Sequence, residues 1–192
     1  MSRHGVQASY TVDMPGVKIR IRNVVVTVTY ERTEFDLEKL ARTLDGARYD
    51  PENFPGVVYK SEEPRASFLI FASGKMNCVG AKSMNDAKLA IRKLTRKLQK
   101  AGIKVKSEPK VKVQNIVASV DFGRGFDLEE IARNFENAEY EPEVFPGLVF
   151  RLDDPKVVFL LFASEKGVCV GAKSRGDVER ATERMVELGL PG

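Results

Sequence analysis

The residues whose types and spacing could support catalysis give little basis for an enzyme. The tripeptide Ser-Gly-Lys at residues 73–75 resembles the end of a phosphate-binding loop, but Leu69 stands where a Walker loop needs its first glycine. Two neighbouring carboxylate pairs, Glu62–Glu63 and Asp153–Asp154, each precede a proline. Such pairs lie in polar turns, where no burial shifts their pKa. We therefore predict that the protein is not an enzyme.

The sequence also contains few residues that could bind a metal or carry out redox chemistry. The single histidine is His4, and the two cysteines, Cys78 and Cys169, sit in apolar runs where a free cysteine behaves as a small hydrophobe. This set excludes a histidine-based triad and lacks the ligand spacing of a zinc site. We expect no metal and no cofactor.

Composition favours an intracellular globular protein. The formal net charge is +4 with a pI near 9.0, which is compatible with nucleic acid without requiring it. Residues 1–16 have no apolar central run, so we interpret them as a flexible tail rather than a secretory signal. The longest apolar run, FLIFA from Phe68, is too short to span a membrane. We expect no membrane association.

Two phenylalanines stand beside Pro-Gly turns, in PENFPGVVYK from Pro51 and PEVFPGLVFR from Pro142. They belong to a repeat: residues 35–83 match residues 126–174 at a shift of 91, with 27 of 49 positions identical. A long period present twice does not indicate a solenoid, which needs at least three copies. It indicates two similar halves, residues 17–104 and 105–192, related by an approximate two-fold axis.

Each half is predicted to contain several antiparallel strands and two helices. In the first half, the strands lie in VVVTVTY, around Val57, in ASFLIF and in MNCVGAK. A short helix follows Asp36 as N-cap, and a long amphipathic helix over residues 85–101 is expected to be capped by Asn85 and stopped by Gly102. The two halves together predict an α+β fold with a wide curved sheet and four helices.

Four helices can cover one face of such a sheet but not both. By strand alternation, Phe68 and Ile70 share one face, and Leu69 and Phe71 share the other. Both faces carry large apolar groups, so the uncovered face is expected to be an interaction surface.

The duplicated pattern NVVVTV…YDPENFPGVV…ASFLIFASGKMNCVGAKS resembles the TATA-box-binding protein family in its archaeal form, over about residues 18–190. The resemblance implies a pseudo-two-fold saddle of two tandem repeats, with a ten-stranded antiparallel sheet and four helices on its convex face. It also implies a general transcription factor that binds the minor groove of TATA-box DNA and kinks it by inserting phenylalanines.

By this resemblance, four phenylalanines are intercalating wedges: Phe54, Phe71, Phe145 and Phe162. The expected minor-groove contacts are Asn23, Val25, Thr27, Asn115, Val117, Ser119, Leu69, Leu160, Val79, Val168 and Val170. Four further residues support the wedges at the groove: Pro55, Pro146, Val57 and Leu148. The candidates for phosphate contacts are Lys60, Arg65, Lys75, Lys82, Arg151, Lys156, Lys166 and Lys173.

The sequence departs from the family pattern at a few groove positions. Val79 and Val170 stand where the family commonly has threonine, and Asn77 stands where valine is common. The second repeat has Glu165 and Gly167 in place of glycine and a large apolar residue.

The expected partners follow from the same resemblance. Double-stranded TATA-box DNA is the ligand, and Glu141 and Glu143 are expected to meet transcription factor B, which recruits RNA polymerase into the preinitiation complex. The protein is expected to act as a monomer on DNA, and the sequence leaves its monomer–dimer balance in solution open. Its location would be the cytoplasm or nucleoid of an archaeon, or the nucleus of a eukaryote.

Alternatives remain open at this point. The four phenylalanines could all be core residues, the lysines and acidic residues could be solvated surface charges, and the basic helix could bind a regulator or flanking DNA. The protein could also be a diverged saddle-shaped protein-interaction module without TATA affinity.

Overall fold

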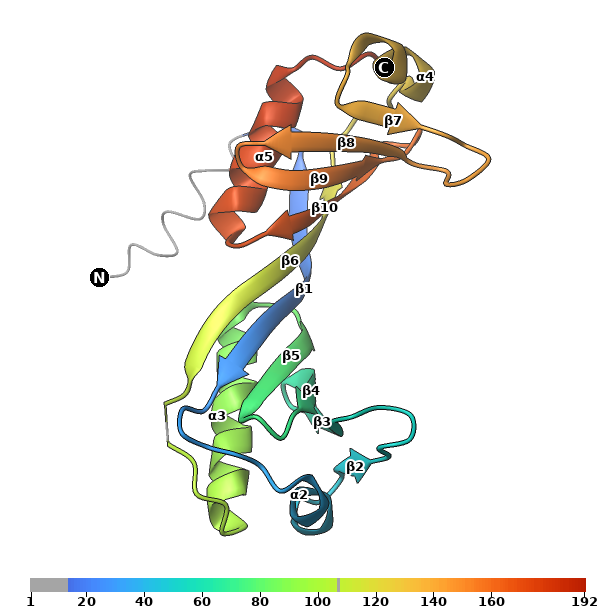
Figure 1. Ribbon diagram of the computed structural model, residues 1–192. Helices are drawn as coiled ribbons and strands as arrows, with labels where there is room; N and C mark the ends of the chain where they lie inside the picture. The colour runs from blue at the N-terminus through green and yellow to red at the C-terminus, as the bar shows by residue number, and fades with distance from the viewer. Residues whose placement is uncertain (1–13, 107) are drawn as a thin grey trace, which may run out of the picture. The chain divides into compact units, whose positions relative to one another are not determined.

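The computed structural model describes residues 14–106 and 108–192 (Figure 1). The described chain divides into two compact units, Arg22–Gln114 and the combination of residues 14–21 with Asn115–Gly192. The ten strands form one antiparallel sheet in the order β2-β3-β4-β5-β1-β6-β10-β9-β8-β7. This order reflects the repeat. Each half contributes five strands, and the equivalent strands follow one another in the same order from either edge of the sheet to its centre.

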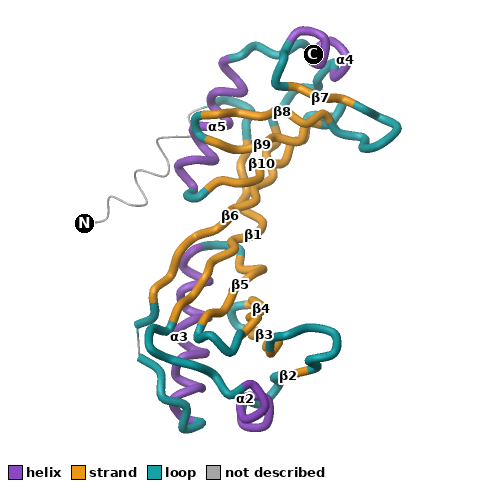
Figure 2. The backbone as a smooth tube through the Cα atoms, in the orientation of Figure 1, coloured by secondary structure: helices purple, strands orange, loops and turns teal. Residues whose placement is uncertain are grey.

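The first half contains five strands and two helices within the described residues (Figure 2). They are β1 (Lys18–Thr29), α2 (Leu37–Thr43), β2 (Arg48–Tyr49), β3 (Val57–Glu62), β4 (Arg65–Ile70), β5 (Lys75–Ala81) and α3 (Met84–Lys100).

The second half repeats this order within the described residues. Its elements are β6 (Lys110–Asp121), α4 (Leu128–Asn134), β7 (Ala138–Tyr140), β8 (Leu148–Asp153), β9 (Lys156–Leu161), β10 (Lys166–Ala172) and α5 (Arg175–Glu187). The α+β prediction with four helices is confirmed.

The core of the Arg22–Gln114 unit lies between its strands and α3. Val26 and Phe68 are fully buried on the strand side, and Leu94 and Leu98 are buried on the helix side. Tyr30 reaches across from the end of β1, where its hydroxyl lies 2.6 Å from Thr95 Oγ1. Burial raises the pKa of Tyr30. The predicted alternation is confirmed where the two strands line this core: Val24, Val26 and Val28 of β1 are buried, as are Ala66, Phe68 and Ile70 of β4, and the residues between them are partly exposed.

The helix starts show where local prediction succeeded and failed. Asp36 caps α2, as predicted, with its side chain accepting from the Lys39 N–H. The prediction that Asn85 caps α3 is wrong. Ser83 is the N-cap, and its Oγ accepts from the Asp86 N–H at 3.0 Å. A serine two residues earlier competes equally well for this position, so residue preference alone could not decide between them.

Candidate nucleic-acid interface

Each unit has a strand face that points away from its buried core. In the Arg22–Gln114 unit, one row across this face follows from the strand registers. Val58 pairs with Leu69, Leu69 with Asn77, and Asn77 with Thr27. All four side chains are partly exposed. The row therefore joins two apolar groups to an amide and a hydroxyl.

The equivalent row in the second unit has nearly the same chemistry. Val149 pairs with Leu160, Leu160 with Val168, and Val168 with Ser119. These residues are also partly exposed. The two rows differ at one interior position, where the first unit has the amide of Asn77 and the second has the apolar Val168.

Two of the expected groove contacts are wrong. Val57 and Leu148 are both fully buried, so neither reaches the exposed strand face. Each strand begins at this residue, and the side chains of β3 and β8 alternate from there. The residues that face outward are Val58 and Val149, which the sequence analysis missed by a one-residue register error. The sequence offered no signal for this phase, and the pairing of Val58 with Leu69 in the structure fixes it.

The four candidate wedges form two ring pairs. Phe54 and Phe71 lie with ring centroids 5.8 Å apart and tilted by 58°. Phe145 and Phe162 repeat this arrangement at 6.0 Å and 61°. None of the four is fully buried, and Phe145 is 37% exposed. The four phenylalanines therefore differ from the fully buried Phe68, Phe150 and Phe159 of the core. Figure 2 shows that the loops carrying Phe54 and Phe145, before β3 and β8, project beyond the strands of their own units.

The glycine of each Phe-Pro-Gly turn provides the floor on which a ring pair packs. A Cβ atom at Gly56 would lie 2.9 Å from a ring atom of Phe54 and 3.2 Å from one of Phe71. At Gly147 the corresponding distances to Phe145 and Phe162 are 2.8 and 2.9 Å. Glycine at both positions leaves the space that this ring arrangement occupies, and neither glycine has a positive φ.

Asn23 and Asn115 occupy equivalent positions on the exposed faces. The Gly80 N–H donates to Asn23 Oδ1 at 2.7 Å, and the Gly171 N–H donates to Asn115 Oδ1 at the same distance. Both glycines adopt positive φ, 91° and 99°, where the pairing register shifts. The asparagines thus have the same local anchor in both units.

The candidate phosphate contacts are all exposed. They are Lys60, Arg65, Lys75, Lys82, Arg151, Lys156, Lys166 and Lys173. Two of them already have acidic partners: Arg151 lies 3.5 Å from Glu139, and Lys166 Nζ donates to Asp121 Oδ2 at 2.6 Å. The hydrogen bonds that Asp121 accepts from Lys166 and from the Gly123 N–H lower its pKa, and the same Lys166 bond raises the pKa of the lysine.

The loop before Phe145 carries the candidate partner residues. Glu141 and Glu143 are exposed, and Val144 between Glu143 and the ring is 79% exposed. The Glu141 carbonyl accepts from the N–H groups of Val144 and Phe145, which folds the loop into a tight turn. The turn holds both carboxylates in solvent, at the same end of the unit as the ring pair.

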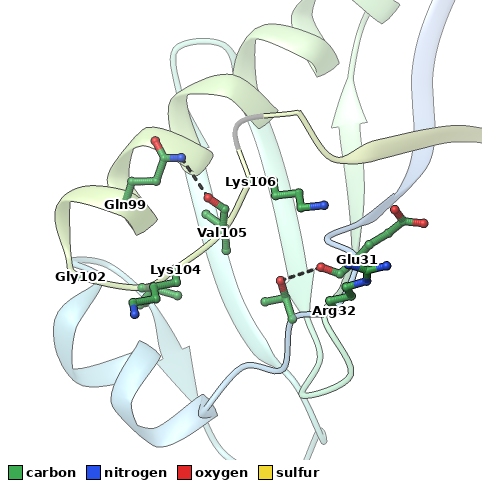
Figure 3. A pocket seen from close by; sticks show the side chains of 9 residues that line it. Glu31, Arg32, Gln99, Gly102, Lys104, Val105 and Lys106 are labelled. Atoms are coloured by element: carbon green, nitrogen blue, oxygen red, sulfur yellow. Dashed lines mark hydrogen bonds between the residues drawn. The ribbon is translucent and has the colours of Figure 1, made fainter.

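A hollow at the end of α3 is unlike a catalytic pocket. It is open, measures about 620 Å³ and lies between the turn after β1 and the segment after α3 (Figure 3). Gln99 closes one side by donating to the Val105 carbonyl at 3.1 Å. Among the described residues there is no group of three or more potential metal ligands, and no helix has the length and apolar character to cross a membrane.

By fold and by the character of its exposed strand faces, the protein belongs to the class of duplicated α+β proteins whose sheet offers an interaction surface. The family model described as transcription factor TFIID, or TATA-binding protein, matches residues 18–101 and 110–188. The chain therefore belongs to the TATA-binding protein family, and it is a general transcription initiation factor rather than an enzyme.

Individual relatives agree with this membership. The chain is 49% identical over 170 residues to the TATA-box-binding protein of Methanocaldococcus jannaschii, covering 88% of this chain and 92% of the relative. It is 50% identical over 182 residues to TATA-box-binding protein E of Halobacterium salinarum, covering 92% and 97%. The solved structure of Methanococcus jannaschii TBP superposes with a TM-score of 0.82 at 48% identity, covering 88% of this chain and 97% of that one.

Proposed function

We propose that the protein binds double-stranded TATA-box DNA in the minor groove through the exposed strand faces of its two units. The observation that carries this proposal is the repeated combination of a partly exposed apolar row and a ring pair on a glycine floor. The ring pairs enter base steps and kink the duplex, which widens the groove for the strand faces.

The chemistry of the faces suits A·T-rich sequence. The minor groove of A·T and T·A pairs presents only acceptors, N3 and O2, and amide groups can donate to either. Valine and leucine side chains complement the sugar and base surfaces that a widened groove uncovers. Steps such as TA unstack with little energy, so the wedges favour sites that contain them.

The same proposal assigns the partners. Glu141 and Glu143 bind transcription factor B, which brings RNA polymerase into the preinitiation complex inside the cell. Negative side chains on an exposed turn are poor ligands for DNA but suit a basic protein surface.

The wedge assignment is tested by replacing Phe145 and Phe162 with alanine together. Bending of a dye-labelled TATA duplex, measured by fluorescence energy transfer, should decrease, and binding should weaken by about tenfold or more, equivalent to ~1.4 kcal/mol. Phe135→Ala is the matched control, because its ring packs on Phe150 and is not a member of the Phe145–Phe162 pair. An unchanged bend in a folded double variant would contradict the assignment.

The alternative, a protein-interaction module without DNA affinity, makes a different prediction in a simpler experiment. A gel-shift titration should show that the unmodified protein binds a TATA duplex more tightly than a G·C-rich duplex of equal length. Equal affinity for both duplexes, or no binding, would favour the alternative.

A further inference from the structure

The exposed rows of the two units differ at Asn77, which stands where the second unit has Val168. Across the sheet, Asn77 lies between Leu69 and Thr27. Val168 also lies between a leucine and a hydroxyl residue, Ser119. Because both rows contain a leucine and a hydroxyl, the amide of Asn77 is the group that gives the first row a different hydrogen-bonding capacity.

The carboxamide of Asn77 is held by one long hydrogen bond. Thr27 Oγ1 donates to Asn77 Oδ1 at 3.4 Å, a distance at which such a bond is weak. Within the described part of the chain, the amino group of Asn77 has no hydrogen-bond partner. The side chain is partly exposed on the strand face, so the carboxamide is available to a ligand.

A carboxamide beside a hydroxyl can be satisfied in two orientations. When the Thr27 hydroxyl donates to the oxygen of Asn77, the amino group faces away from Thr27. When the carboxamide is turned over, its amino group donates to the hydroxyl oxygen, and its own oxygen faces away. Because the bond that is given up is long, turning the group over costs little free energy. The pair can therefore present either a donor or an acceptor.

Asn23 has no such freedom. The Gly80 N–H holds its oxygen at 2.7 Å, and a backbone N–H can only donate. Turning this carboxamide over would set two donors against each other. Asn77 is therefore an amide of a different kind, because its neighbour can act as a donor or as an acceptor.

We propose that the Thr27–Asn77 pair lets the first unit accept a G·C pair at one position of the DNA site, whereas the second unit does not accept one at the equivalent position. This inference rests on the proposed DNA-binding function. In the minor groove, a G·C pair adds the guanine N2 amino group, which needs an acceptor once water is excluded. Asn77 supplies this acceptor by turning its oxygen outward, and Val168 has no polar side-chain atom to offer.

The two halves of a preferred site then differ. The half that faces the first unit tolerates a G·C pair at one place, so a site with a single such pair is bound in one orientation. Asn77 determines this specificity because it contacts the base. Thr27 is a positioning residue, since it bonds to whichever end of the carboxamide faces away from the DNA.

A self-complementary TATA duplex tests the difference, because the protein can bind it in either orientation. In one derivative, a single A·T pair in one half is replaced by G·C. In a second derivative, the symmetry-related pair is replaced as well. Matched duplexes carry I·C, which lacks the guanine amino group, and each position of the half-site is tested in turn.

The expected result is a position at which one G·C pair is tolerated and two are not. One G·C pair should weaken binding relative to I·C by no more than about twofold, the factor for losing one of two orientations. Two G·C pairs should weaken binding by about tenfold, because the second unit must then face one of them. Fluorescence anisotropy titrations measure both ratios.

Exchanging the two distinguishing side chains should exchange the preferences. With Asn77→Val, a single G·C pair should already weaken binding by about tenfold. With Val168→Asn, two G·C pairs should weaken it by no more than about twofold. Both positions are partly exposed, so neither variant removes a core side chain. The control is Asn85→Val, which removes an exposed amide from the first turn of α3 and should leave both ratios unchanged.

The role of Thr27 is tested by removing its hydroxyl. In Thr27→Val, the amino group of Asn77 loses its partner whenever the oxygen faces guanine, so a single G·C pair should weaken binding several-fold. Thr27→Ser restores the hydroxyl and should restore the tolerance. A role in packing alone would not make the ratio of G·C to I·C binding depend on this hydroxyl.

The outcomes separate the inference from the proposed function. The inference is overturned if no position combines a tolerated single G·C pair with a costly double replacement, even though the protein binds the parent duplex. It is also overturned if Asn77→Val leaves both ratios unchanged. Failure of the unmodified protein to bind the parent duplex would overturn the proposed function, and the inference with it.

Discussion

Lys75 and Lys166 occupy equivalent positions in the two repeats but face different neighbours. Lys75 pairs across the ladder with Thr29, whereas Lys166 pairs with Asp121 and forms an ion pair with it. Glu165 adds a further negative charge beside Lys166. An ammonium group already held by a carboxylate has less to gain from a phosphate, so the second repeat is expected to make the weaker backbone contact.

Exchanging the residues that pair with the two lysines across the sheet tests whether their phosphate contacts differ in strength. Asp121→Thr should tighten binding to a TATA duplex several-fold at low salt and make the slope of log K against log salt steeper by about 0.9, one phosphate contact. Titrations by fluorescence anisotropy at several salt concentrations measure both values.

The reciprocal variant is the control for this prediction. Thr29→Asp places a carboxylate opposite Lys75 and should weaken binding with a shallower salt slope. Glu165→Gln should have the same sign of effect as Asp121→Thr but a smaller size, because Asp121 holds the direct hydrogen bond. The interpretation fails if Asp121→Thr leaves both affinity and slope unchanged.

The effect of Asp121 should not depend on pH near neutrality. Its pKa is lowered below 3.8, and that of Lys166 is raised above 10.5. The carboxylate therefore stabilises the fold at pH values above its unfolded pKa, and this contribution disappears only as the pH falls through the lowered value. The affinity difference between Asp121→Thr and the unmodified protein should stay constant from about pH 6 to 9, and a change over this range would indicate another titrating group.

At the scale of the elements, the Phe-Pro-Gly turns are built around ring packing. Gly147→Ala would place a Cβ against the far edges of two rings, 2.8 and 2.9 Å away, and 3.2 Å from the Leu161 carbonyl oxygen. The rings can move outward, so we expect nearly unchanged thermal stability but a reduced DNA bend in the energy-transfer assay.

Gly56→Ala offers a comparison in the first repeat. Its added Cβ would lie 2.8 Å from the Ile70 carbonyl oxygen, which belongs to the strand backbone and cannot move aside freely. This variant should therefore lower the melting temperature as well as the bend. Equal melting temperatures for both variants would show that the strand backbone yields as readily as the rings.

Much of the fold could be predicted from the sequence because the repeat doubles every local signal. Alternation correctly divided β1 and β4 into two faces, and the lack of helices for one face correctly indicated an open surface. Two details required the structure. Val57 and Val58 are adjacent apolar residues at the start of a strand, so alternation gave no phase until the pairing with β4 fixed it.

The groove residues show a second limit of sequence reasoning. Asn77 was noted as a departure from the family pattern, but its place beside Thr27 on the exposed face depends on the β1–β5 register. The Thr27 Oγ1 donates to Asn77 Oδ1 at 3.4 Å, which directs a third amide in the first unit. The anchoring of Asn23 by a residue 57 positions away is likewise set by a bulge that no local pattern predicts.

At the scale of the whole molecule, the two repeats carry opposite charge. Residues 17–104 have 18 lysines and arginines against 10 acidic residues, and residues 105–192 have 12 against 16. The excess in the first repeat includes the exposed outer side of α3, and the acidic excess of the second includes the turn before Phe145. A protein with two similar halves has little means of choosing between the two orientations on a nearly symmetric groove. Partner proteins that recognise the charge difference between the repeats can fix one orientation.

Charge reversal at the acidic turn tests whether a partner protein recognises this charge difference. Changing Glu141 and Glu143 together to arginine should abolish the ternary complex with transcription factor B and DNA in a gel shift, while affinity for the TATA duplex alone stays equal or rises. The equivalent turn of the first repeat carries Asp50 and Glu52, and their reversal provides the matched control, which should leave the ternary complex intact. A normal ternary complex with the Glu141 and Glu143 variant would contradict the partner assignment.

The buried thiols have a practical consequence for all of these measurements. Cys78 and Cys169 are fully buried at equivalent places in β5 and β10, and burial raises the pKa of each to about 12. Because the thiolate is the form that reacts, neither should be alkylated by maleimide at neutral pH while the protein stays folded. A single cysteine introduced on an exposed loop can therefore carry a fluorophore in the otherwise unaltered chain, and the native thiols become reactive only when their own strand opens.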